Sequence, residues 1–310
     1  LEYVLETGEQ QASNELVFDF VDQIYLPIIW DITENPRVKP YSYLFVDECQ
    51  DLSPLELELI IRSVGDTGRL LFVGDKNQSC YGFKGADANS FDNIVKRVNA
   101  KVFPLSVCYR CPSSHIRLIN STLPDIDIRE RDNAPKGAVY FFGQEKAKAN
   151  LKSGDLIICR NTAPLVKLCI QLLSQSVRAT VLGRNIGEGL KTEIKQVSAL
   201  PNFEYSEFEE YLNQLYMSKI IKYKDLENGD ELRESLTDKH QAIQAIYQTQ
   251  VQCKTVIDLC DYIDNLFSDT ASPIQLSTIH KAKGLEANRV FFWGIELLPS
   301  PRAKGWAYKQ

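Results

Sequence analysis

Leu44-Phe45-Val46-Asp47-Glu48-Cys49-Gln50-Asp51 decides the fold class, because an apolar run ends there in two adjacent carboxylates. A short apolar run of this kind predicts a buried strand. Ligand sites in open α/β sheets lie at the carboxyl ends of strands, which is where these acids are placed. Asp47 is suited to hold Mg²⁺ on nucleotide phosphates, and Glu48 to orient and deprotonate a water. The alternative is an ordinary strand end with exposed acids.

A second segment, Leu71 to Asp87, repeats this pattern, since its apolar run is followed by a glutamine, two aromatic residues and a lysine. The amide of Gln78 is suited to sensing a terminal phosphate. Tyr81 and Phe83 are suited to stacking on nucleobases, and Lys84 to meeting a backbone phosphate. The alternative is a glycine-rich turn whose aromatic side chains fill the core.

The rest of the chain alternates apolar runs with helical patterns, which predicts an α/β fold with a parallel sheet covered by helices on both faces. Ser53 and Pro54 mark the start of one helix, and Ser113 is expected to cap another. We expect strands at 43–46, 69–73, 102–105, 138–142, 155–159, 274–278 and 289–293. We expect helices at 55–61, 90–98, 113–123 and 164–175.

Between about 187 and 267 the strand pattern gives way to apolar residues at helical spacing, which predicts a helical insertion. Residues 188–269 carry 16 acidic and 8 basic side chains, a net charge of −8. The remainder carries 25 acidic and 27 basic side chains, a net charge of +2. We therefore expect an anionic ligand to bind outside the insertion.

Composition places the chain among globular proteins, since 44% of its 310 residues are hydrophobic and 25% are charged. No run approaches the ~18 apolar residues of a membrane span and no signal segment is visible, so we expect a cytoplasmic protein with no membrane partner. The net charge of −6 excludes a uniformly basic surface for binding nucleic acid, but it does not exclude a local basic groove. Because the chain starts at Leu1 and its single methionine is Met217, we expect a fragment or a processed chain.

The chain has eight cysteines. Without a secretory signal, reduced thiols are the default and a disulfide framework is not expected. Cys108, Cys111 and His115 have the spacing of part of a zinc site, but no second pair completes it. We therefore expect buried or neutral thiols here rather than a metal site.

Together, the two strand-end segments resemble motifs two and three of the UvrD/Rep-type superfamily 1 DNA helicases. They match these motifs in their order along the chain, in the number of residues between them and in their position at strand ends. Leu105 to Arg110 resembles motif four of this family, Val181 to Gly187 the next element, and Leu276 to Glu286 motif five. Phe18 to Asp22 resembles the "DFDD" element that precedes motif two. The resemblance runs from about Phe18 to Trp293.

The resemblance implies that ATP and Mg²⁺ are the cofactors. Asp47 would hold Mg²⁺, Glu48 would activate water, and Gln78 and Arg110 would respond to the γ-phosphate. The alternative interpretations are that Arg110 is an ordinary surface residue and that His280 has only a structural role. The other implied contacts are with the nucleotide (Gly284 and Glu286) and with single-stranded DNA (Tyr81, Phe83, Lys84, Thr278 and His280).

The resemblance also implies two RecA-like P-loop NTPase domains, both incomplete. We expect residues 1–105 to be the C-terminal part of the first domain and 106–186 the first part of the second. Residues 187–272 would form the helical insertion, and 273–310 the resumed second domain.

Two family motifs are missing. The chain has no Gly-Lys dipeptide, so the phosphate loop G-x-x-x-x-G-K-[ST] is absent. The most similar segment, Gly187 to Thr192 (the decoy segment), has Leu190 between its glycine and its lysine. It also follows the acidic motif, whereas the phosphate loop should precede that motif. The last arginine motif, expected soon after Trp293, is absent as well. We therefore expect this chain alone to hydrolyse ATP poorly or not at all.

The leading hypothesis is part of an ATP-dependent DNA helicase or translocase. It would move along single-stranded DNA and meet duplex junctions, with 3′-to-5′ movement implied by the resemblance. One alternative is the motor part of a helicase–nuclease. Another is a non-catalytic DNA-binding relative, although the combination of Asp47, Glu48, Gln78 and Arg110 argues against decay.

Overall fold

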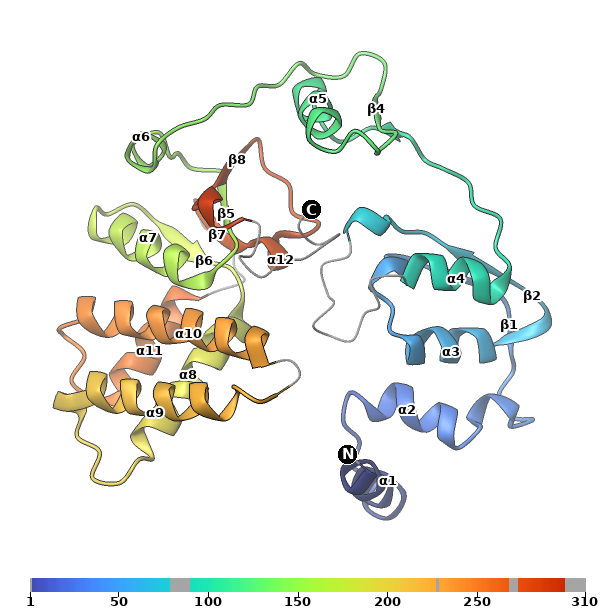
Figure 1. Cartoon of the computed structure of the whole chain (residues 1–310), viewed down its shortest axis with the longest axis horizontal. Helices are drawn as coiled ribbons and strands as arrows, with labels where there is room; N and C mark the ends of the chain where they lie inside the picture. Colours follow the sequence, from blue (N-terminus) through green and yellow to red (C-terminus); the bar gives the residue numbers. More distant parts are fainter. Residues whose placement is uncertain (1, 79–89, 227–228, 268–272, 299–310) are drawn as a thin grey trace. The chain divides into compact units, whose positions relative to one another are not determined.

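The computed structural model describes residues 2–78, 90–226, 229–267 and 273–298. Their contacts divide the chain into two compact units, Leu1–Pro135 (unit 1) and Lys136–Gln310 (unit 2) (Figure 1). Both units are mixed α/β, and the strands in each pair in parallel. No helix within these described ranges is long and apolar enough to cross a membrane.

Unit 1 begins with the helices α1 (Glu2–Glu15) and α2 (Asp22–Ile29), followed by the 3₁₀ turn η1 (Ile32–Glu34). Asp19 fixes the start of α2, because one carboxylate oxygen accepts two backbone N–H groups of the following turn at 2.7 and 2.9 Å. The acidic element before the first strand therefore has a local structural role.

The first sheet of unit 1 consists of β1 (Tyr41–Val46) and β2 (Val64–Phe72). β1 contains the predicted strand 43–46, and β2 ends one residue before the predicted end of 69–73. Pairing continues past both strands, because Val73 N–H donates to Val46 O at 2.8 Å and Cys49 N–H donates to Val73 O at 3.0 Å. The carboxyl ends of β1 and β2 therefore lie side by side.

Two predicted helices, α3 (Pro54–Arg62) and α4 (Ser90–Val98), pack on this sheet. α3 begins as predicted, because Ser53 Oγ accepts the Glu56 N–H at 3.3 Å and the Glu56 carboxylate accepts the Ser53 N–H at 2.7 Å. Such a capping box satisfies backbone donors that the helix leaves unpaired. The small core beneath the two helices is formed by Cys49, Leu57 and Ile94.

The other face of this sheet is open to solvent. Tyr41, Tyr43 and Phe45 are 60%, 63% and 72% exposed, and they alternate with the half-buried Leu44 and Val46. The prediction of a sheet covered on both faces is therefore wrong for the described part of unit 1. Alternation along β1 buries one set of side chains against the helices and leaves the other set outside.

The last part of unit 1 is a short parallel strand pair with one helix, namely β3 (Val107–Cys108), β4 (Arg129–Glu130) and α5 (Ser113–Thr122). The predicted strand at 102–105 is wrong, since these residues form no regular secondary structure and pair with no strand among the described residues. The predicted cap at Ser113 is also wrong. Pro112 occupies the N-cap position, and the Ser113 hydroxyl donates to Pro135 O at 3.2 Å.

Unit 2 is built on a four-stranded parallel sheet in the order β6 (Ala179–Val181), β7 (Ile274–Thr278), β5 (Asp155–Cys159) and β8 (Arg289–Phe292). The predicted strands at 155–159 and 274–278 are confirmed, and β8 ends one residue before the predicted end. β5 is buried along its whole length between β7 and β8, as a central parallel strand requires.

The predicted strand at 138–142 is wrong. Its backbone is irregular, and Tyr140 and Phe141 are 72% and 81% exposed. The rings of Tyr140 and Phe142 stack on each other with centroids 5.8 Å apart. The apolar pattern becomes a strand only where a sheet edge is available, and this segment pairs with no strand that the structure describes.

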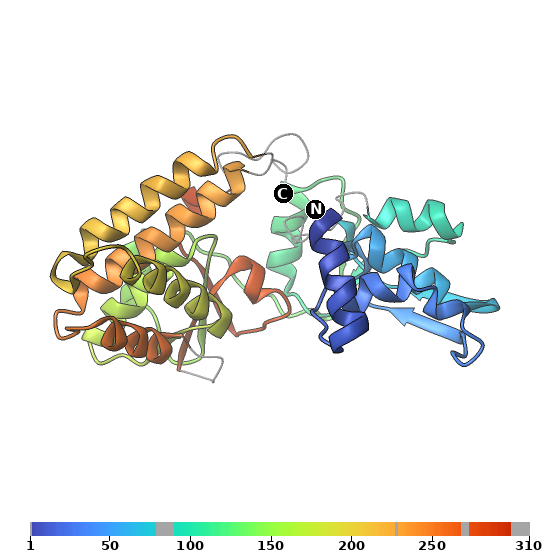
Figure 2. The same ribbon diagram turned by 90° about the horizontal axis from the view of Figure 1, so that it is seen from below.

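The segment predicted as a helical insertion is helical, with α8 to α11 spanning most of it, and these helices share one hydrophobic core with the sheet of unit 2. That core includes Leu165 of α7, Leu276 of β7, and Phe208 and Ile243 of the insertion. Figure 2 shows the yellow and orange helices of the insertion packed side by side. The helices and turns of unit 2 are α6 (Gln144–Ala149), α7 (Thr162–Ser174), α8 (Arg184–Ser198), η5 (Tyr205–Glu207), α9 (Phe208–Lys222), α10 (Gly229–Thr249), α11 (Val256–Leu266), α12 (Ile279–Ala282) and η6 (Ile295–Leu297).

Candidate functional site

The carboxyl ends of β1 and β2 are joined by the buried side chain of Gln50. Its Nε2 donates to Glu48 Oε2 at 2.5 Å, and its Oε1 accepts the Asp75 N–H at 3.0 Å. The Asp75 carboxylate in turn accepts Nε2 of Gln78 at 2.8 Å. A continuous hydrogen-bonded chain therefore runs from Glu48 to Gln78, two residues that the sequence had assigned to one site.

Gln50 and Asp75 were missed as functional candidates. Gln50 is 1% exposed and lies in the 3₁₀ turn η2 (Cys49–Asp51), while Gln78 ends the corresponding turn η3 (Lys76–Gln78) after β2. No local sequence pattern reveals that Gln50 is buried, although a buried amide must find hydrogen-bond partners.

Glu48 has a strained backbone. Its φ of +51° lies in the left-handed region, which costs a non-glycine residue about 1–3 kcal/mol. The Glu48 N–H donates to Asp47 Oδ1 at 2.9 Å, and both acidic residues are exposed. This geometry holds two accessible carboxylates at the strand end, where oxygen ligands suit a divalent cation and a carboxylate can orient water.

Gly74 permits the close approach of the two strand ends. A Cβ at this position would lie 2.4 Å from Gln50 Oε1 and 2.7 Å from Cys49 Sγ. Burial raises the pKa of the Cys49 thiol, and the nearby carboxylates raise it further despite a backbone hydrogen bond, so Cys49 packs as a neutral group. On the other side, Ser90 Oγ donates to Cys49 O at 3.1 Å and fixes the start of α4 to the site.

The remaining unit 1 candidates are Arg110, Tyr81, Phe83 and Lys84. Arg110 lies in the turn between β3 and α5 with an exposed side chain. Tyr81, Phe83 and Lys84, which were predicted to contact DNA, lie outside the residues that the structure describes.

A second group of predicted residues lies at the carboxyl edge of the unit 2 sheet. Thr278 ends β7, and its Oγ1 accepts the Lys281 N–H at 3.4 Å as the N-cap of α12. His280 follows within α12 and is half-buried. Burial lowers the pKa of the His280 imidazole, and the positive charge of Arg160 lowers it further, so the ring is neutral at pH 7. Arg160 directly follows β5, the strand beside β7.

The helical insertion contacts this edge through two acids one turn apart on α10. Glu234 Oε1 accepts Nη2 of Arg160 at 2.7 Å and Nε at 3.2 Å. The Asp238 carboxylate accepts the Thr162 and Ala163 N–H groups at 2.7 and 2.9 Å, which caps α7. Sequence patterns missed these residues, since nothing in the local sequence pairs residue 160 with residue 234.

Gly284 and Glu286, the predicted nucleotide contacts, lie between α12 and β8. Gly284 has a φ of +84°, a conformation that favours glycine, and its missing Cβ would face open space. Glu286 is exposed. Both residues are therefore accessible in unit 2, and their role toward a nucleotide stays a prediction.

Two motif-like features have structural explanations. The decoy 187–192 lies within α8, where Gly187 packs so closely on Phe267 that a Cβ would come within 3.0 Å of its Cβ. A helix interior of this kind does not form a phosphate loop. No group of three metal-ligating side chains occurs among the described residues, so Cys108, Cys111 and His115 do not form a metal cluster there.

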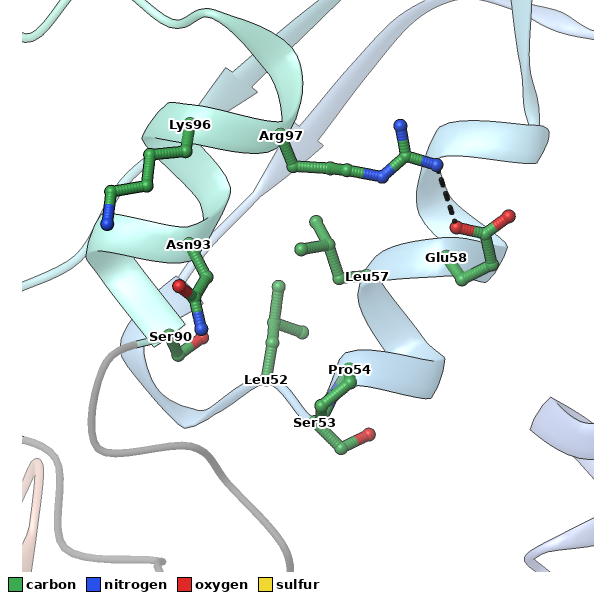
Figure 3. Close-up of a pocket in the computed structure, with 9 residues that line it drawn as sticks. All are labelled: Leu52, Ser53, Pro54, Leu57, Glu58, Ser90, Asn93, Lys96 and Arg97. Atoms are coloured by element: carbon green, nitrogen blue, oxygen red, sulfur yellow. Dashed lines mark hydrogen bonds and ion pairs between the residues drawn. The ribbon is translucent and has the colours of Figure 1, made fainter.

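A hollow of about 420 Å³ lies between α3 and α4 in unit 1. Figure 3 shows the Arg97 side chain reaching from α4 to Glu58 of α3, and the two groups are 3.2 Å apart. None of the residues predicted to bind ATP or DNA lines it. The lining residues are Leu52, Ser53, Pro54, Leu57, Glu58, Ser90, Asn93, Lys96 and Arg97.

Comparison with protein families supports the residue-based assignment. Residues 2–99 match the family described as the UvrD/REP helicase N-terminal domain. This match contains β1, β2 and the whole hydrogen-bonded chain from Glu48 to Gln78.

Individual relatives named as DNA helicases are also similar to this chain. The chain is 26% identical to a probable DNA helicase II homolog of Mycoplasma genitalium, over 84% of this chain and 49% of the relative. It is 33% identical to the ATP-dependent DNA helicase Rep of Escherichia coli, over 38% of this chain and 18% of the relative. It is 26% identical to the RecBCD enzyme subunit RecB of Mycobacterium tuberculosis, over 35% of this chain and 10% of the relative. The chain therefore spans half or less of the length of these relatives.

Proposed function

Since this chain is of the UvrD/Rep helicase type, we propose that it forms part of the motor of an ATP-dependent DNA helicase or translocase. The observation that carries the proposal is the hydrogen-bonded chain Glu48–Gln50–Asp75–Gln78. It connects a candidate general base to a candidate phosphate sensor on neighbouring strands. An exposed acid pair with no role would not need a buried amide to position it.

In the proposed reaction, Glu48 orients a water and accepts its proton. The hydrogen bond from Gln50 fixes the orientation of the Glu48 carboxylate. The hydrogen bond between Asp75 and Gln78 holds the Gln78 amide at a fixed position relative to that carboxylate. Asp47 would hold Mg²⁺, since an exposed carboxylate at a strand end is a suitable oxygen ligand. When bound, the cation would neutralise charge on the nucleotide phosphates. Arg110 would add a positive charge toward the γ-phosphate.

The proposal includes two RecA-like domains that bind ATP, with Gly284 and Glu286 near the nucleotide. It follows the expected division into residues 1–105, 106–186 and 273–310 around the helical insertion. The parallel strands in both units and the placement of the acids at strand ends support it.

On the DNA side, the proposal assigns Thr278 and His280 to single-stranded DNA, together with Tyr81, Phe83 and Lys84. A neutral His280 can accept or donate one hydrogen bond without requiring a counter-charge. Movement in the 3′-to-5′ direction, action at duplex junctions and a cytoplasmic location belong to the proposal on the strength of the family resemblance.

The direct test is Glu48→Gln in the natural protein. We expect DNA-stimulated ATP turnover to fall by about 10²-fold or more, because the amide cannot accept the proton from water. ATP and DNA binding should persist. Asp66→Asn, which changes an exposed acid on β2, is the matched control and should keep the wild-type rate. Unchanged turnover in Glu48→Gln would refute the assignment.

A second candidate function is the motor part of a helicase–nuclease. The similarity to a RecBCD enzyme subunit favours it. Degradation of linear DNA by the natural protein, in the presence of ATP and Mg²⁺, would distinguish this function from unwinding alone.

A further inference from the structure

Two cysteines flank Tyr109 and Arg110 in the turn between β3 and α5. Cys108 is the last residue of β3, and Cys111 precedes the N-cap residue of α5. The Cys111 N–H donates to Cys108 Sγ at 3.4 Å, and the Cys111 thiol also hydrogen-bonds to Cys108. The turn therefore holds the Cys108 sulfur against the backbone of Cys111, and both side chains are only half-buried.

The surroundings of Cys108 favour its thiolate. Burial raises the pKa of the Cys108 thiol, but hydrogen bonds from Cys111 and Arg110, together with the Arg110 charge, outweigh burial and lower it. The nearby N-terminus of α5, a ten-residue helix, adds a favourable dipole. Five other cysteines show the opposite behaviour, since burial raises the pKa of Cys49, Cys159, Cys169, Cys253 and Cys260.

We propose that Cys108 and Cys111 are a redox-active dithiol, which a peroxide converts to a reversible intramolecular disulfide. The spacing Cys-x-x-Cys ahead of a helix is one that places a reactive thiolate next to a second, resolving thiol. Among the described residues there is no cluster of three ligands that would recruit these thiols to a metal ion instead.

The reaction balances with hydrogen peroxide as the only co-reactant. The Cys108 thiolate attacks one peroxide oxygen, so an S–O bond forms, the O–O bond breaks, and the departing hydroxide takes a proton to become water. The Cys111 sulfur then attacks the Cys108 sulfur, an S–S bond forms, and the hydroxyl leaves with the Cys111 proton as a second water. The two sulfur atoms are oxidised and the two peroxide oxygens are reduced.

Disulfide formation would close a covalent loop around Tyr109 and Arg110. An S–S bond of about 2.05 Å would tie residues 108 and 111 together and restrict the two residues between them. This consequence rests on the proposed function, in which Arg110 responds to the γ-phosphate. Oxidation would then slow ATP turnover, and a dithiol reductant would restore it.

The test of the dithiol uses the reduced 310-residue chain and hydrogen peroxide. After treatment, remaining thiols are alkylated under denaturing conditions and the peptides are mapped by mass spectrometry. We expect residues 108 and 111 to be protected in a peptide about 2 Da lighter, and to become alkylatable again after dithiothreitol. Cys49 and Cys169 should remain alkylatable at the same peroxide dose.

Three serine variants sharpen the test, and circular dichroism checks that each is folded. Cys111→Ser should accumulate a sulfenic acid at Cys108 that dimedone traps, whereas Cys108→Ser should give none at Cys111. Cys260→Ser, at another half-buried thiol, should form the disulfide as the unchanged chain does. Oxidation of Cys260 before any disulfide appears, or no sulfenic acid in Cys111→Ser, would overturn the proposal. Neither readout involves ATP or DNA, so the result is independent of the helicase assignment.

The link to Arg110 is tested separately in the natural protein. Peroxide should lower its DNA-stimulated ATP hydrolysis by about tenfold or more. The double variant Cys108→Ser/Cys111→Ser should keep its own rate under the same treatment. An equal loss in both proteins would overturn the link.

Discussion

At the scale of single residues, Gly74 has the most restrictive surroundings in the candidate site. The strand ends approach so closely there that any Cβ would displace Gln50 or Cys49. The glycine therefore serves the hydrogen-bonded chain itself and not a turn with positive φ.

Gly74→Ala should lower the free energy of unfolding by about 1–3 kcal/mol, because the added methyl group overpacks a buried contact. It should also lower ATP turnover in the natural protein by displacing Gln50. Urea denaturation followed by circular dichroism measures the first effect. Gly8→Ala is the control, since its nearest neighbour would be an ordinary 3.8 Å away and alanine is favoured within a helix. Equal stability of Gly74→Ala and the unchanged chain would contradict this account of the strand ends.

The two half-buried histidines of unit 2, His240 and His280, lead to a prediction about pH. Burial lowers the pKa of both His240 and His280 from the ordinary value of 6.5. Between 6.5 and the lower folded value, the unfolded chain binds protons that the folded chain does not bind. The free energy of unfolding should therefore fall as the pH drops from 7 through this window.

Urea denaturation at pH 7 and at about 5.5 measures this dependence. His280→Asn should reduce the loss of stability on acidification, whereas His115→Asn, at an exposed position in unit 1, should leave it unchanged. A loss that is identical in all three proteins would show that His280 is not responsible.

At the scale of elements, the sequence predicted what is decided locally. The helix α3 was recognised because Ser53 and Pro54 carry its start signal in two adjacent residues, and the structure adds Glu56 to that cap. The strand β5 was recognised because Leu156 to Cys159 form a continuous apolar run, as is typical of a central parallel strand. By contrast, 102–105 and 138–142 carry the same apolar signal without a partner strand, and a strand requires one.

The same limit applied to the candidate site. Glu48 and Gln78 were found because each follows a recognisable strand. Gln50 was missed because its role depends on Asp75, 25 residues away, and that contact forms only when β1 and β2 pair. The contacts of α10 with Arg160 and α7 were missed for the same reason.

The cap that α10 provides to α7 is testable. Asp238→Asn should lower the free energy of unfolding by about 1 kcal/mol, because the N-terminus of α7 loses an anionic partner for two backbone N–H groups. Thermal denaturation measures the loss. Asp261→Asn, at an exposed acid on α11, should be neutral. If both variants have the same melting temperature as the unchanged chain, α10 does not stabilise α7 through this contact.

At the scale of the whole molecule, the acidic insertion belongs to the core of unit 2. Its helices bury Phe208, Ile243 and Leu259 in the cluster that also contains the β-sheet. The described part of this acidic segment is therefore packed helix. The near-neutral remainder carries all the residues assigned to ATP and DNA.

The central claim is that the Glu48–Gln50–Asp75–Gln78 chain works as one unit in ATP hydrolysis. The most direct measurement is a double-mutant cycle on DNA-stimulated ATP turnover in the natural protein, with Gln50→Met, Gln78→Ala and the double variant. Because both residues act through one chain of hydrogen bonds, each single variant should lower kcat, and the double variant should be little slower than the worse single variant. Rate losses that multiply in the double variant, or full activity in Gln50→Met, would contradict the account.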